Sequence, residues 1–155
     1  MRISTIIASV FGIGYFPVAS GTVMSIVAMP FAIWIARAGG GFAVIGASLI
    51  AFAIGVWATG DYVRTTGQHD PSECVIDELA GQWLACAGIS LGLGPGSAAE
   101  FALAFLLFRL LDILKPWPIS AAERLPGGWG VMTDDMVAGL FAGAIGAGMQ
   151  YFKVM

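Results

Sequence analysis

Acidic side chains are few in this sequence, and most of them gather in three short stretches. The 155 residues include 10 Asp and Glu, 7 Lys and Arg and a single His. Carboxylates in an apolar protein repel one another, and burying them is costly unless they are paired or bound to a cation. A fold that brings these stretches together is therefore expected to form a cation site. The candidate acids are Glu73, Asp77, Glu78, Asp112, Asp134 and Asp135.

The chemistry of these donors predicts a hard cation. Oxygen ligands select Mg²⁺, with Mn²⁺ or Ca²⁺ as alternatives. Cys74 and Cys86 form no CxxC pair and are expected to be buried apolar side chains, which leaves a zinc–thiolate site unsupported. The predicted metal ligands are Glu73, Asp77, Glu78, Asp134 and Asp135.

The alternative is that these acids only begin helices, where a carboxylate interacts favourably with the helix dipole. That explanation suits Glu73 and Asp134. It does not suit Asp112, which the pattern places at a helix C-terminus, where a carboxylate is unfavourable. The position of Asp112 therefore favours a site over a set of caps.

Basic residues accompany the acids. Arg109 and Lys115 lie three residues before and after Asp112, and mixed cations and carboxylates suit a phosphate bridged by a metal. Arg64 and Arg124 are equally well explained as membrane-surface charges. The single histidine, His69, stands in a polar stretch, where such a residue is more often simply solvated.

Several phosphate chemistries lack their residue patterns here. No Cys is followed five residues later by Arg, no DxDx[TV] or DGxxAR-type pattern occurs, and one histidine cannot make a two-histidine phosphatase site. The chemistry that remains is attack of a metal-activated water on phosphorus.

The elements that must position these residues are strongly apolar. The chain is 58% hydrophobic and 11% charged, whereas soluble domains average about 25% charged residues. This composition predicts a membrane protein, and seven scattered Lys and Arg offer no face for nucleic acid. Residues 1–155 are expected to form one domain.

The pattern predicts an all-α integral membrane bundle of about four spanning helices plus a short N-terminal interfacial or re-entrant helix. Residues 3–16 are too few to cross a bilayer, which takes about 20 residues. Gly139, Gly143 and Ala147 make a small-residue stripe suited to close helix packing. Thr22 is expected to cap the first span. The apolar helices are expected at 23–36, 42–59, 73–91, 98–114 and 134–152, with turns or loops at 38–41, 60–72 and 92–97.

Counting the crossings places the candidate acids on one side of the membrane. Glu100 is the one acid expected on the other side, with Arg37 and Lys153. The excess of Lys and Arg marks the acid-bearing side as cytoplasmic. The basic residues expected there are Arg2, Arg64, Arg109, Lys115 and Arg124.

Three motifs carry a resemblance to a known family. They read GQHDPSECVIDELAG at 67–81, FRLLDILKPWPI at 108–119 and GGWGVMTDDMVAG at 127–139, with a weaker match, FPVASGTVMSIVAMPF, at 16–31. In order and spacing the chain resembles phosphatidylglycerophosphatase A. The resemblance implies an Mg²⁺-dependent phosphatase of the bacterial inner membrane that converts phosphatidylglycerophosphate to phosphatidylglycerol. The count of crossings places its active site on the cytoplasmic side.

The resemblance also implies roles for particular residues. The catalytic candidates are Asp77, Glu78, Asp112, Asp134 and Asp135, and Arg109 and Lys115 would bind the phosphate. Independently of the resemblance, His69 and Thr22 are further substrate-binding candidates. The first motif departs from the family's usual PGTxGS, because Ser20 stands where the family has proline and Met24 where it has glycine.

Two other classes fit part of the pattern. A non-enzymatic ion-binding transport subunit would also carry intramembrane acids, but an ion path should place them at the midplane rather than at helix ends. Another membrane lipid phosphotransferase would need a nucleotide-lipid donor. The clustering of acids on one side favours the phosphatase.

Overall fold

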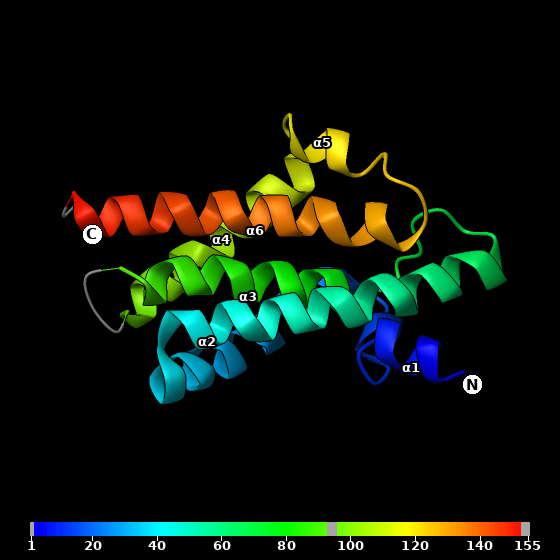
Figure 1. Cartoon of the computed structure of the whole chain (residues 1–155), viewed down its shortest axis with the longest axis horizontal. Helices are drawn as coiled ribbons and strands as arrows, with labels where there is room; N and C mark the ends of the chain where they lie inside the picture. The colour runs from blue at the N-terminus through cyan, green and yellow to red at the C-terminus, as the bar shows by residue number, and fades with distance from the viewer. Residues whose placement is uncertain (1, 93–95, 153–155) are drawn as a thin grey trace.

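The computed structural model describes residues 2–92 and 96–152, and the described residues form helices without any strand (Figure 1). The predicted all-α class is therefore confirmed. Lys153 and part of the predicted turn at 92–97 lie outside the described residues. The elements in order are α1 (Ile3–Ala8), the 3₁₀ turn η1 (Ile13–Tyr15), α2 (Ser20–Thr66), α3 (Ile76–Ser90), α4 (Ala98–Leu114), α5 (Ile119–Ala122) and α6 (Gly128–Tyr151).

The predicted turn at 38–41 is reduced to one residue inside α2. Gly40 alone departs from helical geometry, with φ 74° and ψ −177°. The chain reverses there (Figure 1), since both halves of α2 lie along α3. Trp83 Nε1 donates to the carbonyl of Ala28 in the first half at 2.9 Å, and Ser48 in the second half donates to the carbonyl of Ala80 at 2.8 Å.

The second half of α2 continues to Thr66, so the prediction of a loop at 60–72 was wrong for residues 60–66. Polar side chains do not end the helix because they pair within it. Arg64 donates to Asp61 three residues earlier at 2.6 Å. Asp61 also accepts a hydrogen bond from Ser4 in α1 at 2.6 Å, which ties the N-terminal helix to the end of α2.

The predicted single helix at 3–16 is two short pieces. Between α1 and η1, Val10, Phe11 and Gly12 have φ angles of 45°, 56° and 94°. Backbone hydrogen bonds hold this loop, from Phe11 N to Ile6 O at 2.8 Å and from Gly14 N to Ser9 O at 3.0 Å. Neither piece is long enough to cross a membrane.

Three predicted helix starts are corrected. The helix α3 begins at Ile76, so Glu73 precedes it and does not share a helical face with Asp77. The helix α6 begins at Gly128, so Asp134 lies in its second turn rather than at its cap. Residue 19 is the N-cap of α2, so Thr22 does not cap that helix.

Glycines let α3 and α6 approach closely. A side chain at Gly139 would overlap the backbone of Gly81, and one at Gly88 would overlap that of Gly143. This contact confirms the predicted packing role of Gly139 and Gly143. It also fixes the beginnings of α3 and α6 relative to each other, and those beginnings carry acids.

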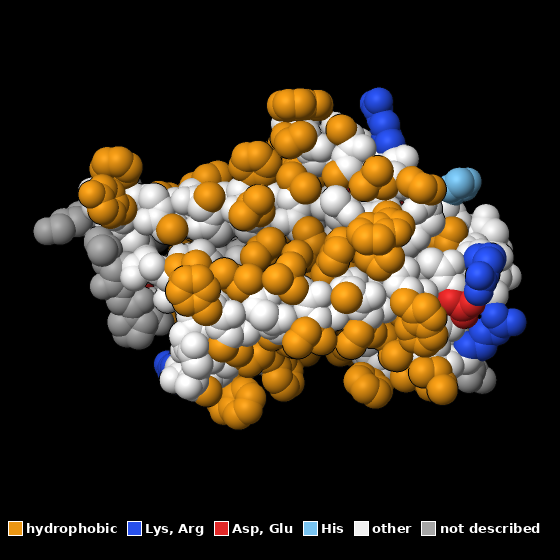
Figure 2. Space-filling model, in the orientation of Figure 1, with side chains coloured by type: hydrophobic (Ala, Val, Ile, Leu, Met, Phe, Trp, Pro, Cys, Tyr) orange, Lys and Arg blue, Asp and Glu red, His pale blue; other side chains and the backbone are white. Residues whose placement is uncertain are grey.

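One helix among residues 2–92 and 96–152, α2, is long and apolar enough to cross a membrane by length and composition. The helices α3 and α4 have 15 and 17 residues, or roughly 22 and 25 Å, against about 30 Å of hydrocarbon. The predicted four-span bundle is therefore not confirmed. Figure 2 nevertheless shows apolar side chains over much of one face, with most of the visible charges near the N-terminal end.

Candidate active site

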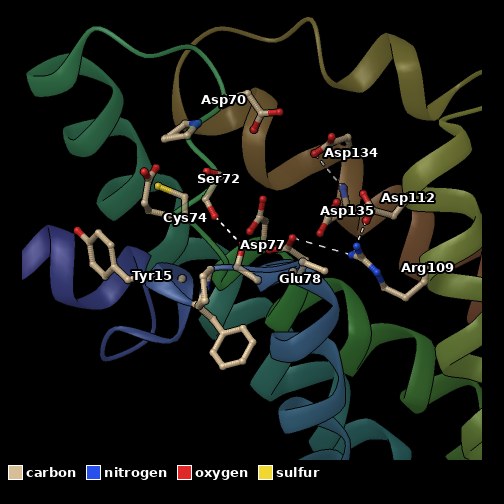
Figure 3. A pocket seen from close by; sticks show the side chains of 18 of the residues that line it. Tyr15, Asp70, Ser72, Cys74, Asp77, Glu78, Arg109, Asp112, Asp134 and Asp135 are labelled. Carbon is tan, nitrogen blue, oxygen red and sulfur yellow. Dashed lines mark hydrogen bonds and ion pairs between the residues drawn. The ribbon is translucent and has the colours of Figure 1, made fainter.

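The ends of four helices meet around a cavity of about 540 Å³ (Figure 3). Its walls are η1, the first turn of α2, the segment before α3, the first turn of α3, the end of α4 and the second turn of α6. Most of the predicted site residues line it. They are Glu73, Asp77, Glu78, Arg109, Asp112, Lys115, Asp134 and Asp135.

Three of the carboxylates form a compact group. Asp77, Glu78 and Asp135 each offer an oxygen, and these oxygens all lie within 4.8 Å of one another. Asp77 and Asp135 are only 8% and 3% exposed. Asp77 Oδ1, Glu78 Oε2 and Asp135 Oδ2 are buried without a hydrogen-bond partner. Such a group of buried acceptors carries a large desolvation penalty that a cation would offset.

The group fits a hard divalent ion, because its donors are oxygens and their spacing suits a shared ligand. Of the five predicted metal ligands, Asp77, Glu78 and Asp135 belong to this group, whereas Glu73 and Asp134 do not. Glu73 lines the same cavity and also has an unpartnered buried oxygen, but it stands outside the compact group. Both carboxylate oxygens of Asp134 already accept hydrogen bonds. Its Oδ2 accepts one from Lys115 Nζ at 2.8 Å, and its Oδ1 accepts one from the backbone N–H of Asp135 at 3.0 Å.

Arg109 lies between two acids. Its Nη1 donates to Asp112 and lies 3.9 Å from Glu78 Oε1, and its Nε is buried without a partner. A guanidinium has five donors in a fixed plane, so Arg109 retains capacity for phosphate oxygens. The predicted placement of Arg109 beside Asp112 is observed, and Asp112 acts as its anchor.

Lys115 joins the ends of α4 and α6. It is the C-cap of α4, with φ 44°, and its ammonium group donates to Asp134 and to Glu123 at 2.7 Å. Partial burial tends to lower the pKa of Lys115, but the hydrogen bonds to these two carboxylates raise that pKa overall. Lys115 therefore stays positively charged beside Asp134.

Glycines bring backbone close to the acids, a feature that the sequence reasoning missed. A side chain at Gly21 would overlap the carboxylate of Glu78, and one at Gly14 would overlap the carbonyl of Glu73. Ser20, beside Gly21, donates to the carbonyl of Ser72 at 2.9 Å. The small residues at 19–22 were the available signal for this close approach.

Two substrate-binding candidates lie elsewhere. Thr22 is not among the residues that line the cavity. His69 is exposed and lines a neighbouring cavity of about 370 Å³, which shares Asp70 and Asp134 with the first. Cys74 does line the main cavity, but burial and the nearby Glu73 raise the pKa of its thiol to about 12, which excludes a ready thiolate nucleophile.

Comparison with known proteins identifies the family to which this site belongs. The model of the family Phosphatidylglycerophosphatase A matches residues 6–150. The chain belongs to the phosphatidylglycerophosphatase A family. The predicted family and enzyme class, a phosphatidylglycerophosphatase acting as a phosphoric monoester hydrolase, are confirmed.

Individual relatives of the phosphatidylglycerophosphatase A family cover most of the chain. Phosphatidylglycerophosphatase A of Escherichia coli (strain K12) is 34% identical over 92% of this chain and 78% of its own length. A putative phosphatidylinositol-3-phosphatase of Bacteroides thetaiotaomicron is 32% identical over 88% of this chain and 87% of its own. Phosphatidylglycerophosphatase A of Haemophilus influenzae is 34% identical over 68% of this chain and 63% of its own length. No solved structure matches.

Proposed function

We propose that this chain releases the terminal phosphate of phosphatidylglycerophosphate to give phosphatidylglycerol, using a divalent cation, Mg²⁺, held by Asp77, Glu78 and Asp135. The observation that carries the proposal is the group of three carboxylates whose buried oxygens lack partners. Caps or surface charges would not need three acids from two helices at one point. When bound, the cation would neutralise these acids and activate water for attack on phosphorus.

The chain's own residues would orient the phosphate. Arg109, anchored by Asp112, has free donors for phosphoryl oxygens and would stabilise the charge that develops on them. Asp134 would accept the proton from the attacking water, and the ammonium group of Lys115, which donates to Asp134 Oδ2, would hold this carboxylate in position. Glu73 would complete the wall of the cavity near the cation.

The surface supports a location in the bacterial inner membrane with the cavity facing the cytoplasm. Large apolar side chains are exposed along the helices, among them Phe42 at 79% and Ile113 at 67%. A soluble protein rarely exposes so much contiguous apolar surface. The charges gather toward the cavity end (Figure 2), which agrees with the excess of Lys and Arg expected on the cytoplasmic side.

A second lipid is a reasonable substrate because the Bacteroides relative bears the name of a phosphatidylinositol-3-phosphatase. Both lipids present a phosphate monoester on a headgroup, so the same acids and Arg109 would serve either. The shape of the cavity beyond the phosphate would have to select between a glycerol and an inositol.

The test is phosphate release by the purified chain from each lipid, without any nucleotide-lipid donor, in Mg²⁺ and in excess EDTA. We expect release from phosphatidylglycerophosphate that depends on Mg²⁺ and is lost in Asp134→Asn. A full rate in EDTA would contradict the cation, and near-normal turnover of Asp134→Asn would remove that residue from the mechanism. Faster release from phosphatidylinositol 3-phosphate would reassign the substrate.

A further inference from the structure

An apolar groove of about 430 Å³ lies on another face of α3 from the carboxylates. Its walls are α1, the second half of α2 and α3. On α3 the groove is lined by Ile76, Leu79 and Trp83, which share one helical face at i, i+3 and i+7. Asp77 and Glu78 lie in the same turn but point elsewhere, so one turn of helix borders both the groove and the charged cavity.

The N-terminal segment provides a second wall common to both. Ile7, Val10 and Phe11 line the groove, while Tyr15 and Phe16, a few residues later, line the charged cavity. Figure 3 shows Tyr15 at the edge of that cavity. A molecule with a phosphate at one end and a hydrocarbon tail at the other would find both environments along this segment.

The backbone of this wall is held in an unfavourable shape. Val10 and Phe11 are left-handed, with φ 45° and 56°, a region that branched and bulky residues avoid. Hydrogen bonds from Phe11 N and Gly14 N maintain it. The result is that Phe11 stands 86% exposed at the rim of the groove, and strain maintained in this way is typical of ligand-binding segments.

We infer that the groove holds an acyl chain of the lipid whose phosphate occupies the charged cavity, an assignment that rests on the proposed function. An extended peptide is a poor occupant because its backbone N–H and C=O groups need partners. The lining side chains are apolar apart from the indole N–H of Trp83, which already donates to the carbonyl of Ala28. An acyl chain has no such requirement.

Filling the groove tests the inference. Ala47 lines it, whereas Ala102 lies exposed on α4, away from it. We expect Ala47→Phe to raise KM for a long-chain phosphatidylglycerophosphate about ten-fold relative to a short-chain one, and the matched Ala102→Phe to leave that ratio unchanged. An unchanged ratio in Ala47→Phe, with both lipids equally affected or unaffected, would overturn the inference.

Trp83 allows a second test that does not depend on turnover. In a variant whose other tryptophans, Trp34, Trp57, Trp117 and Trp129, are replaced by Phe, the fluorescence of Trp83 reports the groove. We expect long-chain phosphatidylglycerophosphate brominated on its acyl chain to quench this fluorescence saturably in detergent micelles. At the same mole fraction, brominated phosphatidylcholine should quench it far less.

The two tests separate the groove from the reaction. Equal quenching by both brominated lipids would mean that bulk lipid fills the groove, which would overturn the inference even if phosphate is released. Selective quenching with no phosphate release would support the groove and contradict the proposed function.

Discussion

The close grouping of three carboxylates, Asp77, Glu78 and Asp135, destabilises the folded protein. Each offers an oxygen within 4.8 Å of the others, and each has a buried oxygen without a hydrogen-bond partner, so each negative charge raises the free energy of the folded protein when no cation is present. Sites that bind charge often retain such destabilising groups, and removing one commonly stabilises the fold while abolishing function.

Asp135→Asn tests this trade-off. The substitution keeps the size of the side chain and removes one of the repelling charges, so we expect the thermal midpoint in EDTA to rise by about 2–4 °C. Phosphate release should fall at least about 100-fold. Thermal unfolding with and without Mg²⁺ and a turnover assay check both expectations.

Glu100→Gln is the control for that experiment. Glu100 accepts hydrogen bonds from the side chain of Gln150 and from the backbone N–H of Ser97, the N-cap residue of α4. Neutralising a satisfied carboxylate should lower the midpoint, not raise it. A rise in both variants would mean that general loss of negative charge, rather than the local repulsion, is responsible.

Substitution of Gly21 is expected to lower the rate of phosphate release as much as substitution of the acids does. In Gly21→Ala the new methyl group would collide with the carboxylate of Glu78 and displace it. A displacement of about 1 Å in an active site costs roughly 100-fold in rate. Gly46→Ala is the matched control, since a methyl group there meets nothing and favours the helix by up to about 1 kcal/mol. Equal activity of the two variants would contradict the role of Gly21.

The sequence was informative about which acids would meet, but not about their partners. Counting apolar helices placed Asp112 and the Asp134–Asp135 pair at one end, and the structure brings them to one cavity. That Asp134 pairs with Lys115, while Asp77, Glu78 and Asp135 each keep a buried oxygen without a hydrogen-bond partner, depends on side-chain positions across helices. Spacing along one chain does not contain that information.

At the level of elements, the predictions failed mainly where polarity was taken to mean a loop. Residues 60–66 are polar yet helical, because Asp61 finds Arg64 and Ser4 as partners. The first turn of α6 lies before residue 134, where the sequence predicted this helix to begin. It is a helix because Gly128 packs against the backbone near Val56, a tertiary contact that overrides the low helix propensity of glycine.

Asp61 is expected to control the position of α1. It accepts from Ser4 and Arg64, and Arg2 lies 3.7 Å away. In Asp61→Asn the charged partner is lost, so amide hydrogens of α1 and the loop after it should exchange faster. Hydrogen exchange checks this, with amides near Gly139 as the internal control because the α3–α6 contact is remote from Asp61. Unchanged exchange in α1 would contradict the anchor.

For the whole molecule, the prediction to test is which side of the membrane each end of the helices faces in the proposed topology. Cys74 and Cys86 are buried, so single cysteines introduced elsewhere can be labelled with little background. We expect a membrane-impermeant maleimide to reach His69→Cys only from the cytoplasmic side and Arg37→Cys only from the other. Labelling of both from the same side would contradict the proposed topology.

The break at Gly40 has a consequence for how the chain is made. Its φ and ψ lie in a region open essentially only to glycine. Without the break, α2 would be a rod of 47 residues, roughly 70 Å long and more than twice the hydrocarbon thickness. In the proposed membrane topology, the two halves of α2 enter the bilayer together as a hairpin during synthesis, and the backbone conformation at Gly40 lets them form the surface on which the later helices assemble.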